Sequence, residues 1–194
     1  MKLEQLQARL LELEAENRFL RERLQFLEYH PTIAAGLRGE TLVSQAVNGT
    51  LTVFTASSDV VISDSGLRLE VKYSKLNQAV AKIGASTQRW TWSRPLGQNN
   101  SKVYDRLILV GVADIRYRAQ YCDPESPFVI FDVPFAEVAP LARKSGTHWN
   151  IQISTNPLRS STAPAQALFK QYQVSPAELT RRYGNIAAAL PGRD

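Results

Sequence analysis

The stretch DVVISDSGLRLEVKY, residues 59–73, decides the fold. Its first half is rich in β-branched residues, and Asp64-Ser65-Gly66 is a turn signal. After the turn, apolar and polar residues alternate strictly, which is typical of a half-buried strand. The stretch therefore predicts an antiparallel hairpin. Its pairing would bring Asp59 close to Glu70, although eleven positions separate them in the chain.

The segments around this hairpin predict an α/β fold with a mixed central β-sheet flanked by helices. Arg106 to Val112 is a continuous apolar run, typical of a strand that is covered on both faces. Other strands are expected at residues 51–55, 128–133 and 149–154. Helices are expected at residues 36–47, 76–92, 134–143, 165–172 and 175–183. The last of these has a helix-start signal, with Ser175 as N-cap, Pro176 at the first position and Glu178 at the third.

Three acids and a lysine around the hairpin could act together. Glu40 lies on the first helix expected in the domain, Asp59 opens a strand, and Glu70 and Lys72 share one face of the next strand. Carboxylates hold Mg²⁺ through hard oxygen ligands, and the ion lowers the pKa of a bound water. A nearby lysine can orient or deprotonate that water, or stabilise charge on a phosphate. Phosphodiester hydrolysis needs this combination of groups.

Asp59, followed after ten residues by Glu70-Val71-Lys72, resembles the motif of the PD-(D/E)xK nucleases. That superfamily includes restriction endonucleases, Holliday-junction resolvases and phage or repair nucleases. The resemblance covers residues 36–112, and resolvase-like members carry an acidic residue at the position of Glu40. It implies a restriction endonuclease-like core, with Asp59, Glu70 and Glu40 at a Mg²⁺ ion and Lys72 acting on the nucleophile. Mn²⁺ could replace Mg²⁺. Ser58 stands where the family's name has proline.

The turn of the hairpin decides whether the two acids can meet. A three-residue turn with regular pairing would place Asp59 and Glu70 on opposite faces of the sheet. A two-residue turn or a bulge would bring them to one face, and Gly66 could form that bulge. Asp64 is a competing acid, which we interpret as a turn residue. The alternative interpretation of the motif is an exposed hairpin with ordinary surface charges.

The first thirty residues carry a heptad repeat. Leucines at alternating steps of three and four, with Asn17 in the one gap, predict a parallel two-stranded coiled coil. The a positions are Leu3, Leu10, Asn17 and Leu24, and the d positions are Leu6, Leu13, Leu20 and Leu27. An amide at a can bond to its symmetry mate, which specifies a dimer in this register. The alternative is a solitary amphipathic helix that lies on the domain.

Flanking charges agree with a parallel homodimer. Facing positions of two copies would pair Arg9 with Glu14, Glu16 with Arg21 and Arg23 with Glu28. Leucine rather than isoleucine or valine at a leaves a higher oligomer open. Only two residues precede the repeat, so it lacks the basic region that DNA-reading zippers carry. The repeat is therefore interpreted as a clamp between copies, with Leu6, Leu13, Asn17, Leu20 and Leu27 as its main contacts.

Charge and composition limit the classes of partner that the protein is expected to bind. The net charge is +5, with five Lys/Arg and six Glu in residues 1–30, and 18 Lys/Arg against 12 acids in residues 31–194. The basic excess therefore lies on the globular part, which suits a polyanion such as double-stranded DNA. No apolar run approaches the ~20 residues that span a bilayer, so a cytoplasmic protein without a membrane partner is expected. A single cysteine, Cys122, excludes an intrachain disulfide.

Several polar and basic residues downstream of the motif could contact DNA. Trp90 and Trp92 lie among them, and the sequence does not decide whether they contact DNA or pack in the core. The candidate DNA contacts are Lys75, Gln78, Gln88, Arg89, Arg94 and Lys102.

The sequence thus predicts three parts: a coiled-coil helix at 1–30, a nuclease core at 31–160 and a C-terminal helical segment at 161–194. The function expected is that of a Mg²⁺-dependent deoxyribonuclease. A dimeric, sequence-specific restriction-type endonuclease comes first, because the two-fold axis of a parallel coil matches a palindromic site. A Holliday-junction resolvase or repair nuclease is the second enzyme. A non-catalytic coiled-coil DNA-binding or adaptor dimer is the alternative from another class.

Overall fold

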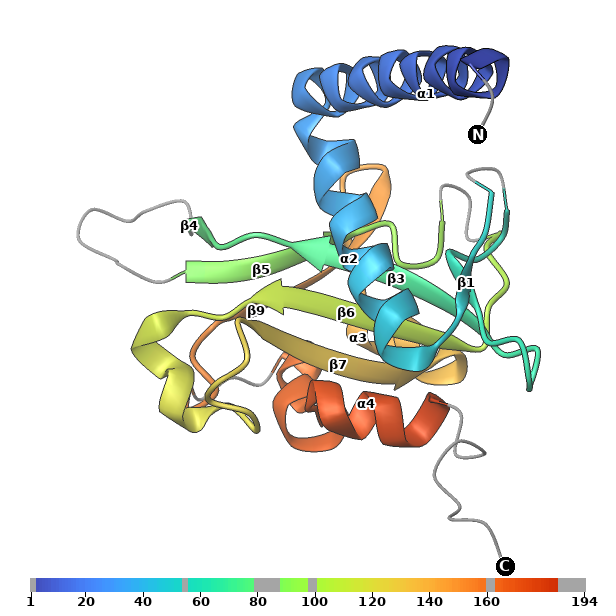
Figure 1. The fold of residues 1–194 in the computed structure, drawn as a ribbon. Coiled ribbons are helices and arrows are strands. Elements are labelled where there is room, and N and C mark those ends of the chain that lie inside the picture. The colour runs from blue at the N-terminus through green and yellow to red at the C-terminus, as the bar shows by residue number, and fades with distance from the viewer. Residues whose placement is uncertain (1–2, 54–55, 79–87, 98–100, 160–162, 185–194) are drawn as a thin grey trace, which may run out of the picture. The chain divides into compact units, whose positions relative to one another are not determined.

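A computed structural model gives the fold (Figure 1) and describes residues 3–53, 56–78, 88–97, 101–159 and 163–184. The chain divides into two compact units, residues 1–37 and 38–194. Helix α2 (Pro31–Val47) begins in the first unit and ends in the second. Within the described parts of the chain, every helix is too short or too polar to span a bilayer.

A six-stranded mixed sheet forms the centre of the second unit, with strand order β1-β2-β3-β6-β7-β10. Strands β3 and β6 are parallel, and the other neighbours are antiparallel. The mixed α/β class is therefore confirmed. The six strands are β1 (Thr50–Leu51), β2 (Val60–Val61), β3 (Arg68–Ser74), β6 (Arg106–Val112), β7 (Phe128–Pro134) and β10 (Gln173–Val174).

A second, antiparallel sheet has the order β4-β5-β9-β8. We call it sheet B. Its strands are β4 (Asn77–Gln78), β5 (Gln88–Ser93), β8 (Arg143–Ser145) and β9 (His148–Ser154). Short helical segments complete the second unit: η1 (Ile115–Gln120), η2 (Phe135–Glu137), α3 (Val138–Leu141), η3 (Pro164–Gln166), η4 (Leu168–Tyr172) and α4 (Pro176–Tyr183).

The two faces of the central sheet contribute to different cores. Alternate residues of β3 and β6, such as Val71 and Ile108, pack with Val43 of α2 and Leu179 of α4. Both helices therefore cover one face, as Figure 1 shows. Leu109 and its neighbours on the other face pack against sheet B, in a core that includes both tryptophans of β5. Glu70 pairs with Leu107 across β3 and β6 and so lies on the sheet B side.

The predicted hairpin is confirmed, and a loop of four residues closes it. Val60 pairs with Leu69, and the N–H of Ile62 donates to the carbonyl of Leu67 at 3.0 Å. Four residues then form the turn, and Gly66 adopts a φ of +68°, which favours glycine. An even loop has the same parity as a two-residue turn, so a bulge at Gly66 is not needed to bring Asp59 to the side of Glu70. The pairing is irregular at Asp59 itself, because its N–H donates to the carbonyl of Leu69 at 2.9 Å although Leu69 pairs with Val60.

The helix predicted at residues 76–92 is wrong where the structure describes it. Residues 77–78 and 88–92 are in strands β4 and β5, and residues 79–87 lie outside the described residues. Polar and aromatic residues alternate in Arg89-Trp90-Thr91-Trp92-Ser93, and the two tryptophans are 0% and 1% exposed. Their indole N–H groups donate to the carbonyls of Val112 and Val110. Burial of alternate aromatic side chains therefore outweighs the helical tendency of the flanking residues.

Two other predictions are only partly right: of the described residues in the strand predicted at 51–55 only Leu51 is in a strand, and the helix predicted at 134–143 consists of η2 and α3, with Arg143 in β8. The remaining elements fit more closely. The helix predicted at 36–47 starts earlier, at Pro31, and the strands at 106–112, 128–133 and 149–154 are present. The Ser175 side chain accepts a hydrogen bond from the N–H of Glu178 at 3.0 Å, with Pro176 at the first helical position, as predicted. Residues 165–172 form η3 and η4 rather than one regular helix.

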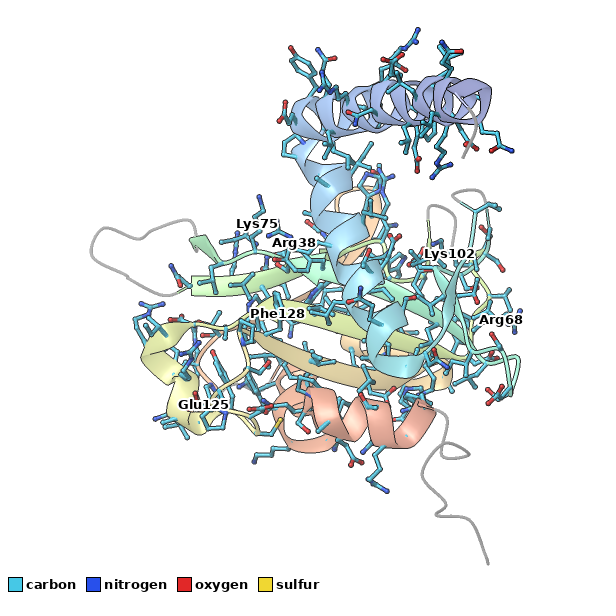
Figure 2. All side chains as sticks on the ribbon, in the orientation of Figure 1. Arg38, Arg68, Lys75, Lys102, Glu125 and Phe128 are labelled. Atoms are coloured by element: carbon cyan, nitrogen blue, oxygen red, sulfur yellow. The ribbon has the colours of Figure 1, made fainter. Side chains whose placement is uncertain are left out.

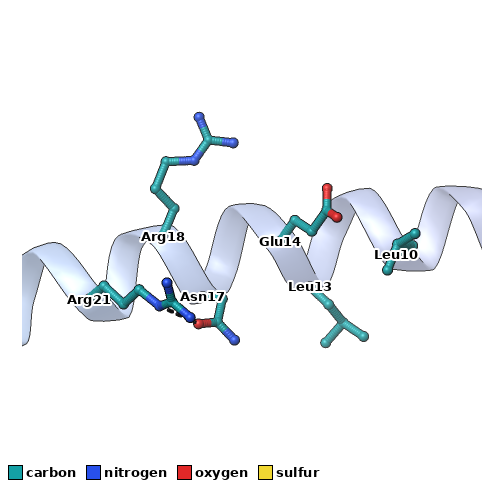
Figure 3. A pocket seen from close by; sticks show the side chains of 6 residues that line it. All are labelled: Leu10, Leu13, Glu14, Asn17, Arg18 and Arg21. Carbon is teal, nitrogen blue, oxygen red and sulfur yellow. Dashed lines mark hydrogen bonds between the residues drawn. The ribbon is translucent and has the colours of Figure 1, made fainter.

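Helix α1 (Leu3–Tyr29) is continuous in the first unit, and most described leucines of its apolar seam are exposed in the single chain, whereas Leu27 is half-buried. Leu6, Leu10, Leu13 and Leu24 are each 44–62% exposed, and the side chain of Leu20 lies outside the described ones. Figure 3 shows Leu13, Asn17 and Arg21 on one side of the helix. In this chain the Asn17 side-chain oxygen accepts a hydrogen bond from Arg21 Nε at 3.1 Å.

Candidate active site

The candidate site lies at the edge of β3 where β2 ends. Strand β2 pairs with β3 only as far as Leu69. Beyond Leu69 a side chain replaces the strand as hydrogen-bond partner: Asp59 Oδ2 accepts a hydrogen bond from the N–H of Val71 at 2.8 Å. This bond fixes the carboxylate beside Glu70. The Oδ1 atom of Asp59 points to a cation, with Lys102 Nζ 3.8 Å away.

Glu70 is a fully buried carboxylate with two lysines on it. Lys72 Nζ donates to Oε1 at 2.5 Å, and Lys102 Nζ donates to Oε1 and Oε2 at 2.6 Å each. The side chain of Glu70 is 0% exposed, whereas those of the lysines are 24% and 27% exposed. The two lysines therefore lie between Glu70 and the solvent, and Glu70 is the most deeply buried group of the site.

Lys102 reaches the site from the loop before β6 and is labelled in Figure 2. Its backbone N–H donates to the carbonyl of Leu96 at 3.2 Å. Because β3 and β6 are parallel, their N-terminal ends are neighbours, and a residue shortly before β6 comes close to Glu70. The same ammonium group lies near both Asp59 and Glu70 and links the two acids.

Glu40 comes to the site on helix α2. The preceding residue, Gly39, is buried, and a Cβ there would lie 2.9 Å from Cβ of Tyr73 on β3. Only glycine allows the helix to approach the strand this closely. The charges of Asp59 and Lys72 both act on Glu40. Direct contacts join Asp59, Glu70 and Lys72 with Lys102, whereas Glu40 is linked to them only through the effect of their charges.

Both Glu70 and Glu40 hold their protons more tightly than ordinary carboxyls. Burial raises the pKa of Glu70, the ammonium of Lys72 opposes this shift, and the charge of Asp59 adds to it. Burial likewise raises the pKa of Glu40, and the negative charge of Asp59 raises it further. The three carboxyl groups outnumber the two ammonium groups of Lys72 and Lys102, so an added cation would stabilise the ionised carboxylates.

The donor set suits a Mg²⁺ ion held by two carboxylates. Among the described residues, no three His, Cys, Asp or Glu side chains are arranged to hold a metal together. Mg²⁺ commonly binds to only one or two carboxylates and keeps several waters. The Lys102 ammonium stands in for such a cation, because it contacts Glu70 through both oxygens and faces Asp59 Oδ1. Asp59 and Glu70 therefore fit the ion, and Glu40 lies outside any three-ligand group.

The candidate DNA contacts separate into two places. Lys102 is in the acid cluster, which the sequence did not indicate. Lys75 is exposed just after β3, and Arg94 is exposed after β5, with its guanidinium 3.0 Å from His148 Nε2. Gln78, Gln88 and Arg89 belong to sheet B, where Gln78 pairs with Gln88. Trp90 and Trp92 are core residues.

Tyr104 is a neighbour of the site that sequence reasoning missed. It is 2% exposed, and its hydroxyl donates to the carbonyl of Pro95 at 2.6 Å. Burial raises the pKa of its hydroxyl, and the charge of Glu70 raises it further. Tyr104 thus packs behind the loop that carries Lys102. No local pattern marks it in the sequence.

Sequence comparisons with family models and curated proteins found no match for this chain.

Proposed function

We propose that this chain is a Mg²⁺-dependent endonuclease with a restriction endonuclease-like core, which hydrolyses phosphodiester bonds in double-stranded DNA. One observation carries the proposal: Asp59, which is distant in the sequence from Glu70 and Lys72, lies beside them at the edge of β3, and the charges of all three act on Glu40. A hairpin with ordinary surface charges would leave its acids solvated. Here Glu70 has a side-chain exposure of 0%, and its carboxylate has a lysine on each oxygen.

Each residue has a role that its contacts suggest. Asp59 and Glu70 would hold the ion, and Val71 fixes Asp59 so that Oδ1 stays available. A bound Mg²⁺ supplies charge neutralisation and a lowered water pKa. Lys72, whose Nζ lies 2.5 Å from Glu70 Oε1, would orient the attacking water or, as a neutral amine, accept its proton. Glu40, on helix α2, would influence the charge of the site through an intervening water.

We further propose that two copies associate through α1 as a parallel coiled coil. Four seam leucines are exposed in the single chain, namely Leu6, Leu10, Leu13 and Leu24. The charges beside the seam are complementary between parallel copies. The paired sites would then be related by a two-fold axis, as in a restriction-type enzyme acting on a palindrome. Higher oligomers and a resolvase or repair role remain alternatives to this arrangement.

The test is metal-dependent nicking of supercoiled plasmid by the purified chain. Wild-type protein should nick in Mg²⁺ and not in EDTA, and Asp59→Asn should lose nicking because the ion loses a charged ligand. Asp64→Asn is the matched control, since Asp64 is an exposed acid in the turn of the same hairpin. Equal activity of both variants would contradict the assignment. Cleavage of four-way junctions but not of linear duplex would favour the resolvase.

A non-catalytic DNA-binding or adaptor dimer is the second candidate, and one observation favours it. Lys102 already neutralises Glu70, so the cluster could be a buried ion-pair network without a metal. In that case Mg²⁺ would produce neither nicking nor a binding heat with the wild-type protein. The plasmid assay, repeated with calorimetric titration of Mg²⁺, therefore separates the two candidates.

A further inference from the structure

Sheet B consists of two segments of the chain that contain no acidic residue. All 18 Asp and Glu residues of the protein lie outside residues 71–104 and 138–177. Together these two segments hold ten Lys or Arg residues. Strands β4 and β5 come from the first segment, and β8 and β9 come from the second. The fold therefore brings the two acid-free stretches together in one sheet.

The two faces of sheet B differ completely in chemistry. Trp90, Trp92 and Ile151 point inward and are at most 1% exposed. The register pairs Thr91 with Gln152, and Ser93 with Asn150, so these polar residues share the opposite face. Asn150 in turn pairs with Arg143 of β8. We call this the outer face, made of Arg89, Thr91, Ser93, Arg143, Asn150 and Gln152.

An open groove of about 680 Å³ runs over part of the outer face. Arg89, Thr91, Ser93 and Gln152 line it, together with Leu76 and Asn77. Gln152 joins two of them, since its Oε1 accepts from Arg89 at 3.3 Å and its Nε2 donates to Thr91 Oγ1 at 2.9 Å. Arg89 Nε and Asn150 Oδ1 are buried atoms with no hydrogen-bond partner among the described residues. Both atoms lie beneath the surface of the face, where hydrogen-bonding capacity is left unsatisfied.

Ser74 links β5, which carries part of the outer face, to the strand that carries Glu70 and Lys72. Ser74 lies two residues after Lys72 in β3, so the two side chains are on the same face of the strand. Its hydroxyl oxygen accepts hydrogen bonds from the N–H of Thr91 at 3.0 Å and from Asn77 Nδ2 at 3.3 Å. A ligand lying along β5 would therefore extend toward Lys72.

From this placement we propose that the outer face of sheet B binds the sugar–phosphate backbone of double-stranded DNA next to the site. The inference rests on the proposed nuclease function. Arginines without competing acids suit phosphate oxygens, and Ser, Thr, Asn and Gln hydroxyls and amides are common backbone contacts. A single strand is a poorer fit, because single-strand binders stack bases on aromatic side chains. Both tryptophans of β5 are turned into the core.

Adjacent basic residues on β8 give a matched pair of variants. Arg143 lies on the outer face, whereas Lys144 pairs with Trp149 and lies on the other face of the same strand. Both are exposed, so neither substitution should unfold the protein. The affinity for a fluorescent duplex is measured by anisotropy in EDTA, over a range of salt, so that cleavage does not enter. Arg89→Gln is a third variant, with folding checked by thermal unfolding.

Arg143→Ala and Arg89→Gln should each weaken binding and lower the slope of log affinity against log salt by about one unit. Lys144→Ala should leave the slope unchanged. Equal slopes in all three variants and the wild type would overturn the proposed face, as would a wild type that does not bind duplex. Face-dependent binding without nicking in Mg²⁺ would instead support the face and contradict the nuclease. If the wild type nicks DNA and the face variants bind DNA as well as the wild type does, the nuclease would be supported and the proposed face contradicted.

Discussion

The ammonium of Lys102 lies 2.6 Å from both carboxylate oxygens of Glu70 and 3.8 Å from Asp59 Oδ1. A divalent ion held by these two acids would need the same position. We therefore expect Lys102→Met to bind Mn²⁺ or Ca²⁺ more tightly, by about tenfold or more (1.4 kcal/mol). Calorimetric titration measures this affinity directly. Lys75→Met, which removes an exposed charge nearby, should change it far less. Equal affinities in Lys102→Met and wild type would show that the lysine and the ion do not compete.

Substitution of Lys72 should act on the rate rather than on the fold. Lys72→Met keeps the length of the side chain but removes the group that bonds to Glu70. We expect cleavage to slow by roughly 10²–10⁴-fold, the range of general acid–base effects. Single-turnover assays at saturating Mg²⁺ measure the rate, and circular dichroism checks the fold. Full activity in Lys72→Met would contradict the role assigned to this lysine.

The close approach of α2 to β3 should make Gly39 sensitive to substitution. In Gly39→Ala the new methyl group would lie 2.9 Å from Cβ of Tyr73, so the helix must move away. Overpacking of this kind costs about 1–3 kcal/mol of the free energy of unfolding. Urea denaturation measures the loss. Gln45→Ala, at an exposed position of the same helix, should stay within about 0.5 kcal/mol of wild type.

The dimer register depends on Asn17. Replacing the amide by leucine removes the polar group that favours two strands, so Asn17→Leu should shift the protein toward higher oligomers. Light scattering coupled to gel filtration measures the mass. Arg18→Gln serves as control, because Figure 3 shows Arg18 on the opposite side of the helix from Asn17. A clean dimer of Asn17→Leu would argue against the proposed register.

Acid stability should depend in part on Asp114. Hydrogen bonds from Arg116 and from the Thr155 hydroxyl hold the pKa of its buried carboxyl below the usual value. A folded-state pKa below the unfolded one means that this stabilisation is present above about pH 4 and is lost as pH falls further. In Asp114→Asn the free energy of unfolding should be lower near neutral pH and should fall less steeply below about pH 4. Urea titrations across that range measure both. An unchanged acid slope would exclude this contribution.

Alternation along the chain was sufficient to predict the hairpin of β2 and β3. It predicted the strands and their pairing, because hydrophobic side chains must share one face. It did not give the parity of the loop, which depends on how Gly66 closes the turn. The same rule was available for β5, where Trp90 and Trp92 alternate with polar residues. We predicted a helix there because the residues before Trp90 do not alternate between polar and apolar.

The site was predictable only where its residues are local. Glu70 and Lys72 lie two apart on one strand, and the hairpin adds Asp59. Lys102 escaped prediction as a site residue because its position follows from the parallel pairing of β3 with β6, a tertiary relationship that no short window contains. The outer face of sheet B is a similar case. Each of its segments is merely short of acids in the sequence, and only their assembly makes a surface.

The hydrogen bond from Val71 to Asp59 also covers part of an open sheet edge. Beyond Leu69, none of the described strands pairs with this side of β3, so its backbone groups could accept a strand from another chain. The Asp59 carboxylate occupies the first of these groups and places a negative charge at the opening. A substitution of Asp59 would therefore expose this edge of β3 as well as remove a carboxylate from the candidate site. An inactive Asp59 variant is informative only if it also stays free of aggregates.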